Sequence, residues 1–155
     1  RSGSRGDLPT GITHAQANRA ELKALVDSSR PPGLIGYNGK VPVGWISLGP
    51  REEFLKLRRS PVMKAVDETP VWSIICFVVP SCFRGQGVAR AMLAGAMAYA
   101  RQCGAEVLEA YPVDTARRTH DESMWFGAKS MFDDAGFVEV LRRKPRRPVM
   151  RFAVE

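Results

Sequence analysis

The sequence predicts an α/β (α+β) fold, in which helices cover both faces of a mixed, mostly antiparallel sheet that contains a central pair of parallel strands. Two apolar runs, at residues 71–79 and 107–111, flank an alanine-rich helical segment, and a strand–helix–strand crossover of this kind makes its two strands parallel. Hairpin patterns, which form antiparallel strands, precede and follow this unit. Segments with helical spacing separate the apolar runs, as is typical of a sheet with helices packed on it.

The length and composition of the chain limit the classes of protein to which it can belong. Its 155 residues predict a single domain over positions 1–155, and its 45% hydrophobic content is typical of a soluble globular protein. No run of about 18 apolar residues is present, so we expect no membrane span. An odd number of cysteines without a signal-peptide pattern favours free thiols and a cytoplasmic location. The formal net charge of +7 indicates an anionic partner without identifying it.

The first elements are a helix and a hairpin. Thr13 and Gln16 form a capping-box pattern, which predicts a helix over residues 14–28. Two apolar runs around Asn38-Gly39 predict a β-hairpin over residues 34–46, because this dipeptide readily adopts the positive φ angles that a tight hairpin turn needs.

The crossover unit occupies the middle of the chain. An amphipathic helix over residues 51–59 and a loop precede it. The run at 71–79 contains β-branched and aromatic residues without polar alternation, which is typical of a strand buried on both faces. A helix rich in alanine and methionine follows over residues 88–103 and stops at Gly104, and residues 107–111 form the second buried strand.

The last elements are a helix and a second hairpin. Helical spacing predicts a helix that begins at residue 123 or 126 and ends at 135. Strands over residues 137–141 and 149–154 then flank a strongly basic turn at 142–148, which we interpret as a solvated hairpin tip. Nucleic-acid binding by this turn is less favoured, because it contains no aromatic residue that could stack on a base.

The segment that carries chemistry joins the first buried strand to the helix after it. The start of a helix exposes unpaired N–H groups and a partial positive charge, and both favour phosphate binding. Gly85 and Gly87 let the backbone turn sharply and approach a ligand closely, while Arg84 and Arg90 add positive charge. The segment therefore predicts a pyrophosphate site. It is not a dinucleotide fingerprint, because Arg90 stands where that motif has its third glycine, and the chain contains no P-loop motif.

The pattern Arg84-x-x-Gly87-x-Ala89, which follows a Val-Val-Pro strand end, resembles the acyl-CoA loop of the GNAT superfamily of N-acetyltransferases. A helix that closes in Gly136-Phe137 before the last hairpin is also similar to that family. The resemblance covers residues 34–155. It implies a GNAT-like sheet, N-acetyltransferase activity and acetyl-CoA as the co-substrate.

The resemblance also implies roles for particular residues. The main chain of Phe77, Val78 and Val79 would pair with the pantetheine arm, and the N–H of Val78 would lie near the thioester carbonyl and stabilise the oxyanion. The second parallel strand would diverge from the first, so that thioester and amine could meet between them. The residues implied to hold the pyrophosphate are Arg84, Gly85, Gln86, Gly87, Val88, Ala89 and Arg90.

The chain departs from the family pattern at two places. Many members carry a tyrosine that protonates the departing thiolate, four residues before the glycine of the Gly-Phe pair, and here that position is Phe132. Residues 1–12 show no convincing strand, so we expect either that the family's first strand is absent or that this chain is an N-terminally shortened copy. Among polar groups at the end of the second parallel strand, Tyr111 and Asp114 rank first as acid or base, because ligands bind at strand ends.

These observations favour an N-acetyltransferase that moves an acetyl group to a primary amine by direct attack. Because Phe132 has no proton to give, a non-catalytic acyl-CoA sensor or partner module on the same fold stays open as the alternative. The chain shows no zinc-ligand spacing, so we expect no metal. Cys76 and Cys103 are expected to be buried, and the terminal hairpin could extend a partner's sheet into a homodimer. The resemblance implies that the segment with Arg58, Arg59 and Lys64 borders the acceptor site, and these cations favour an anionic or amphoteric amine.

Overall fold

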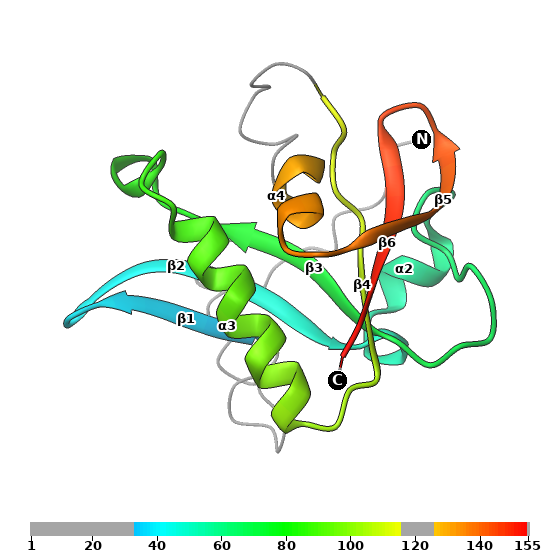
Figure 1. Ribbon diagram of the computed structural model, residues 1–155, viewed down its shortest axis with the longest axis horizontal. Coiled ribbons are helices and arrows are strands. Elements are labelled where there is room, and N and C mark those ends of the chain that lie inside the picture. The colour runs from blue at the N-terminus through cyan, green and yellow to red at the C-terminus, as the bar shows by residue number, and fades with distance from the viewer. Residues whose placement is uncertain (1–32, 116–125, 155) are drawn as a thin grey trace, which may run out of the picture. The chain divides into compact units, whose positions relative to one another are not determined.

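A computed structural model describes residues 33–115 and 126–154 of the chain (Figure 1). Its centre is a six-stranded sheet with the strand order β1-β2-β3-β4-β6-β5, in which β3 and β4 are parallel and every other neighbouring pair is antiparallel. The predicted mixed sheet with a central parallel pair is confirmed. The strands are β1 (Gly33–Asn38), β2 (Val41–Pro50), β3 (Trp72–Val78), β4 (Val107–Ala110), β5 (Val138–Lys144) and β6 (Arg147–Ala153).

Two helices, α3 (Val88–Gln102) and α4 (Lys129–Asp134), lie on one face of the sheet (Figure 1). The larger hydrophobic core lies between them and the sheet. Apolar residues of α3 recur three and four positions apart, so they form one face that packs on the sheet. Helix α3 packs closely on β2, because a Cβ atom at Gly44 would lie 3.1 Å from a methyl carbon of Val88. The core-facing residues of the two helices are Met92, Leu93, Ala96, Ala100, Met131 and Phe132.

A second, smaller core covers the opposite face of the sheet, so the prediction of helices on both faces is also confirmed. Its helical part is α2 (Leu55–Arg59), which contributes the fully buried Leu57. The strands alternate between the two cores, because successive side chains of a strand point to opposite faces. In and just after β4, for example, Leu108 and Ala110 belong to the first core and Tyr111 to the second.

The first hairpin forms where it was predicted, but its turn is different. Asn38 pairs with Val41, so the two turn residues are Gly39 and Lys40 rather than Asn38 and Gly39. Only Gly39, the first turn residue, has a positive φ, at 62°. This pattern is typical of a type II′ turn, which needs glycine at the first position only.

Two predicted helices are shorter than expected. The segment at residues 51–59 is divided into a 3-10 turn η1 (Arg51–Glu53) and α2, because the backbone of Phe54 leaves the helical region. Helix α4 begins only at Lys129. Ahead of it, the positive φ of Gly127 and a parallel bridge between Val113 and Ala128 keep the chain extended. The predicted helix over residues 14–28 and the question of a first strand fall outside the described residues.

The final hairpin is longer than predicted, which corrects the interpretation of its basic residues. Strands β5 and β6 extend to Lys144 and from Arg147, so the tip consists of only two residues. Arg143 donates hydrogen bonds to three backbone carbonyls and Arg147 is half-buried, so these two side chains are structural parts of the protein rather than a solvated tip. Only the exposed tip, residues 145 and 146, matches the predicted solvated turn.

The three cysteines occupy two kinds of environment. Cys76 is buried in β3 as expected, and burial raises the pKa of its thiol to about 11. Cys103 was expected to be buried as well, but it is exposed, because α3 ends at Gln102 and the chain turns away from the sheet at Gly104. Cys82, which lies in the 3-10 turn η2 (Ser81–Phe83) after β3, is also exposed.

Candidate active site

The two parallel strands pair over a short distance and then separate. Three cross-strand pairs join them, and the last is Ile74 with Ala110. Beyond it β3 continues to Val78, while β4 ends. The register of β3 against β2 also shifts between Ser47 and Leu48, which leaves Ile75 as an extra residue on β3. A bulge of this kind bends a strand and re-aims the residues after it. The far end of β3 is therefore not paired with β4.

The predicted oxyanion residue Val78 lies on this unpaired end of β3. Its side chain is 37% exposed, whereas the five residues before it are buried. Phe77 turns its ring into the larger core, where it meets Phe132 edge to face at a centroid distance of 6.1 Å. Among the described residues, no strand pairs with the main chain of β3 on the side where β4 has ended.

The glycine loop that follows has the geometry of an anion site. Gly85 and Gly87 both have left-handed backbones, with φ of 75° and 80°. Gly87 caps α3 without any side-chain hydrogen bond, so the capping residue leaves the N–H groups of the first turn of the helix without a side-chain acceptor of its own. A Cβ atom at either glycine would meet nothing within 4 Å. The loop therefore places a helix start next to open space.

The polar side chains of this loop bond mainly to neighbouring parts of the protein. The Nε of Arg84 donates to the carbonyl of Val79 at 2.9 Å, and the amide of Gln86 donates to the carbonyl of Cys82 at 3.1 Å. Arg90 forms an exposed ion pair with Asp134 of α4 at 2.8 Å. The structure thus gathers the predicted phosphate-binding residues at one helix start.

Phe132 is fully buried, and the local backbone explains why it is held firmly. Its ring packs edge to face between Phe77 and Phe137, 5.1 Å from the latter. Gly127 closes over it from the loop before α4, where a Cβ atom would lie 2.9 Å from Phe132 Cε2. The family's acid position is therefore an apolar packing position in this chain.

We predict that Gly127→Ala destabilises the protein by about 1–3 kcal/mol, because its φ of 85° is unfavourable for alanine and the new methyl would press on Phe132. Urea unfolding measures the change. Gly104→Ala is the control for the positive φ alone, since its Cβ would meet nothing within 4 Å. Equal destabilisation of the two variants would show that contact with Phe132 contributes nothing.

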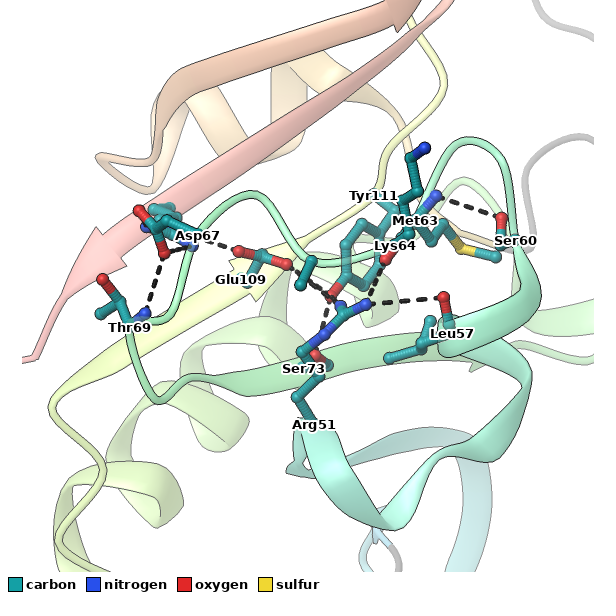
Figure 2. Close-up of polar contacts among 12 residues, drawn as sticks. Arg51, Leu57, Ser60, Met63, Lys64, Asp67, Thr69, Ser73, Glu109 and Tyr111 are labelled. Atoms are coloured by element: carbon teal, nitrogen blue, oxygen red, sulfur yellow. Dashed lines mark hydrogen bonds and ion pairs between the residues drawn. The ribbon is translucent and has the colours of Figure 1, made fainter.

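Tyr111 follows β4 and lies at the centre of a buried polar network on the smaller-core face (Figure 2). Its hydroxyl donates to the carboxylate of Glu109 at 2.7 Å and accepts from Arg51 Nη1 at 2.7 Å. Since a phenol has one proton, the 2.8 Å contact with Ser73 is a donation from serine to tyrosine. Burial, followed by the charge of Glu109, holds the pKa of the Tyr111 phenol well above its usual range.

Glu109 is the buried anion of this network, and two arginines neutralise it. Arg151, its cross-strand partner on β6, donates from Nε at 2.8 Å, and Arg51 approaches it at 3.4 Å. Sequence reasoning did not single out these residues. A signal was present, because Glu109 is the one charged residue within a strand of otherwise apolar character and Ser73 breaks an apolar run in the same way.

Three arginines anchor the connection between β2 and β3 to this face, as Figure 2 shows for the contacts of Arg51. Two of them bind backbone carbonyls and the third binds Asp67, whose pKa the Arg151 guanidinium holds well below the usual range. These bonds therefore hold the connection in place against this face of the sheet. The bonds are from Arg51 to Met63 at 2.7 Å, from Arg143 to Lys64 and Ala65 at 2.7 and 2.9 Å, and from Arg151 to Asp67 at 2.9 and 3.0 Å.

Asp114, the other predicted acid or base, lies on the surface three residues beyond Tyr111. Its carboxylate pairs with Arg142 of β5 at 2.8 Å, and its N–H donates to the carbonyl of Arg146 at 2.9 Å. The carboxylate remains more than one-third exposed. The structure thus places Tyr111 in the interior and Asp114 at the rim of the same strand end.

Two further features of the described residues bear on the class of protein. Within residues 33–115 and 126–154, no three His, Cys, Asp or Glu side chains are grouped so that they could hold a metal ion. None of the helices in that part of the chain is long and apolar enough to cross a membrane.

Comparisons with known proteins agree with this geometry. Two solved structures of similar fold are a ribosomal-protein-alanine N-acetyltransferase from Brucella melitensis (20% identity, TM-score 0.57, covering 89% of this chain and 78% of the other) and yncA from Salmonella typhimurium with its cofactor acetyl-CoA (19%, 0.54, 90% and 74%). A search of curated proteins found no sequence match. The model of the acetyltransferase (GNAT) family matches residues 7–124. The chain therefore belongs to the GNAT family of acetyltransferases, as the resemblance of its Arg84–Ala89 loop predicted.

Proposed function

We propose that this protein is an N-acetyltransferase that moves an acetyl group from acetyl-CoA to a primary amine by direct attack. Two adjacent features carry the proposal together. Strand β3 continues beyond the end of its parallel partner β4, and the glycine loop that leads into α3 follows it directly. An extended main chain that no described strand pairs with on one side, and a helix start beside open space, suit the two parts of a CoA molecule, its pantetheine arm and its pyrophosphate.

In this proposal the backbones of Phe77, Val78 and Val79 hydrogen-bond to the pantetheine arm. The N–H groups at the start of α3 bind the pyrophosphate, because a helix N-terminus carries both unpaired donors and a partial positive charge. The open space around Gly85 and Gly87 leaves room for that approach. The residues assigned to the pyrophosphate are Arg84, Gly85, Gln86, Gly87, Val88, Ala89 and Arg90.

Acetyl-CoA supplies an acetyl group activated as a thioester, and the protein's groups act on the atoms around it. The N–H of Val78 donates to the carbonyl oxygen as negative charge develops there, and a preorganised donor of this kind contributes roughly 2.7–4 kcal/mol. Holding the amine beside the carbonyl carbon supplies most of the remaining acceleration. The base that takes the amine proton must then lie at the diverging strand ends.

Asp114 is the proposed base, acting directly or through water, because its carboxylate is exposed at the end of β4. Tyr111 marks the point where the strands diverge. Its proton is already donated to Glu109, so its proposed contribution is to position the end of β4. The thiolate can leave without an acid at Phe132, since thiols have a pKa near ~8.5 and are stable as thiolates near neutral pH.

We predict that acetyl-CoA protects Cys82 from alkylation and leaves Cys103 unprotected. Both thiols are exposed, but Cys82 lies beside the proposed pyrophosphate loop and Cys103 ends α3, about 22 Å away along a 15-residue helix. Modification by iodoacetamide, followed at each cysteine by mass spectrometry, measures the effect, and buried Cys76 should react only after unfolding. Equal modification rates at Cys82 with and without saturating acetyl-CoA would contradict the proposed site.

The second candidate function is a non-catalytic acyl-CoA sensor, which the buried phenylalanine at the family's acid position favours. The two functions separate in one assay. A transferase releases CoA thiol when amines are added, whereas a sensor shows the Cys82 protection and no thiol release across a broad amine panel.

A further inference from the structure

Arg147 is the first residue of β6, and its guanidinium is held over the end of β4. Its Nη2 donates to the carbonyl of Tyr111 at 3.2 Å, and its central carbon lies 4.5 Å from the centre of the Phe126 ring. Within residues 33–115 and 126–154, its buried Nε has no hydrogen-bond partner, and no other buried side-chain nitrogen or oxygen is in that state. Buried polar atoms nearly always have partners, so this donor requires an explanation.

Three other arginines near this strand end are paired with acids. Arg51 and Arg151 approach Glu109, and Arg142 pairs with Asp114. In the part of the chain that the structure describes, Arg147 meets no carboxylate. Burial lowers the pKa of its guanidinium, but arginine remains charged in proteins. A half-buried cation with a buried free donor is costly unless an anion compensates it.

The position of Arg147 connects it to the proposed reaction. Phe126, on which its guanidinium stacks, packs against the smaller core together with Ile75, Cys76 and Tyr111. These are the residues at which β3 and β4 part. The glycine loop belongs to α3, which packs on the opposite face of the sheet. If the thioester enters from the α3 face, the amine reaches the diverging strands from the face that carries Arg147.

We propose that Arg147 binds a carboxylate of the acceptor, so that the acceptor is an amine that also carries a carboxylate, such as an amino acid. This inference rests on the proposed acetyltransferase function. A guanidinium presents parallel N–H donors that match the two oxygens of a carboxylate, and Nε is one of them. Exposed cations on α2 add to the same preference. They are Lys56, Arg58 and Arg59.

The test compares free amino acids with their carboxamides, which keep the amine and lack the negative charge. CoA release is followed with the wild-type protein and with Arg147→Gln, Arg147→Lys and the control Arg146→Gln, whose side chain is exposed at the hairpin tip. Loss of a hydrogen bond to a charged group corresponds to roughly 10- to 100-fold in affinity. We expect the wild type to prefer the free acids by about that factor, expressed mainly in KM.

In Arg147→Gln the preference should disappear, because the KM of the free acids rises toward that of the carboxamides, while the affinity for acetyl-CoA stays the same. Arg147→Lys should retain part of it, and Arg146→Gln should behave as the wild type does. Binding of N-acetyl amino acids, measured by calorimetry, gives a readout that does not depend on turnover and should weaken only in the Arg147 variants.

Three results would overturn the inference. A wild-type protein that acetylates carboxamides as well as free acids would exclude a carboxylate site while leaving the transferase function intact, and this comparison needs no variant to fold. If Arg147→Gln still prefers free acids to carboxamides as strongly as the wild type does, Arg147 is not the residue that binds the carboxylate. A protein that binds acetyl-CoA and acetylates no amine would overturn the transferase function and the inference together.

Discussion

Glu109→Ala is expected to lower the free energy of unfolding by about 3–5 kcal/mol, because it leaves buried arginine charge without its anion. The carboxylate of Glu109 is buried and accepts from Tyr111 at 2.7 Å and from Arg151 at 2.8 Å. Arg51, which approaches it at 3.4 Å, also holds Met63, so the connection between β2 and β3 should loosen. Urea denaturation measures the loss, and hydrogen exchange over residues 57–67 reports the loosening.

Asp134→Ala is the matched control for this experiment. It also removes the acid of an ion pair at 2.8 Å, the one with Arg90, but both side chains are more than half exposed. Exposed pairs contribute only about 0–1 kcal/mol, so this variant should unfold almost as the parent does. Glu109→Gln, which keeps the shape and one acceptor oxygen, should fall between the two. A cost below about 1 kcal/mol for Glu109→Ala would mean that the network does not stabilise the fold.

Gly87→Trp is expected to abolish measurable acetyl-CoA binding. The φ of Gly87 is 80°, and a left-handed backbone costs other residues about 1–2 kcal/mol, which alone corresponds to roughly a 5- to 30-fold loss of affinity if the loop relaxes without ligand. The indole would also fill the open space in front of α3 that the proposed pyrophosphate needs. Calorimetric titration with acetyl-CoA measures the loss.

Gly95→Trp supplies the control, because Gly95 is exposed on α3, has no positive φ, and a Cβ there would meet nothing within 4 Å. It should bind acetyl-CoA as the parent does. Gly87→Ala, which adds the backbone cost without the indole, should be intermediate. If Gly87→Trp binds acetyl-CoA normally, the start of α3 is not the pyrophosphate site.

Much of the fold was predictable because its signals are local. The apolar runs that became β3 and β4, and the glycines around α3, act through the preferences of a few neighbouring residues. Element ends were predicted less well. Helix α4 starts late because Val113, from a distant part of the chain, bridges to Ala128 and keeps that segment extended. Such a contact has no counterpart in helical spacing.

The candidate site likewise has one part that the sequence predicted and one part that it did not. The Arg84–Ala89 loop could be identified because strand end, glycine positions and helix start are consecutive in the chain. The network around Tyr111 could not, since Arg51 and Glu109 are 58 residues apart and meet only when β2 and β4 join one sheet. The basic hairpin shows the same limit, because residues that look like one charged turn divide between exposed, carbonyl-bound and half-buried positions.

The sequence by itself therefore determined the family and the parallel pair at the centre of the sheet, and it predicted the location of the acyl-CoA loop, because each depends on periodicity or on adjacent residues. Only the tertiary structure decided which charges are paired. It buried Glu109 between two arginines and, in the part of the chain that the structure describes, left the Nε of Arg147 without an acceptor. The physical reason is that the energy of a charge depends on its burial and its partners, and both are set by contacts between distant parts of the chain.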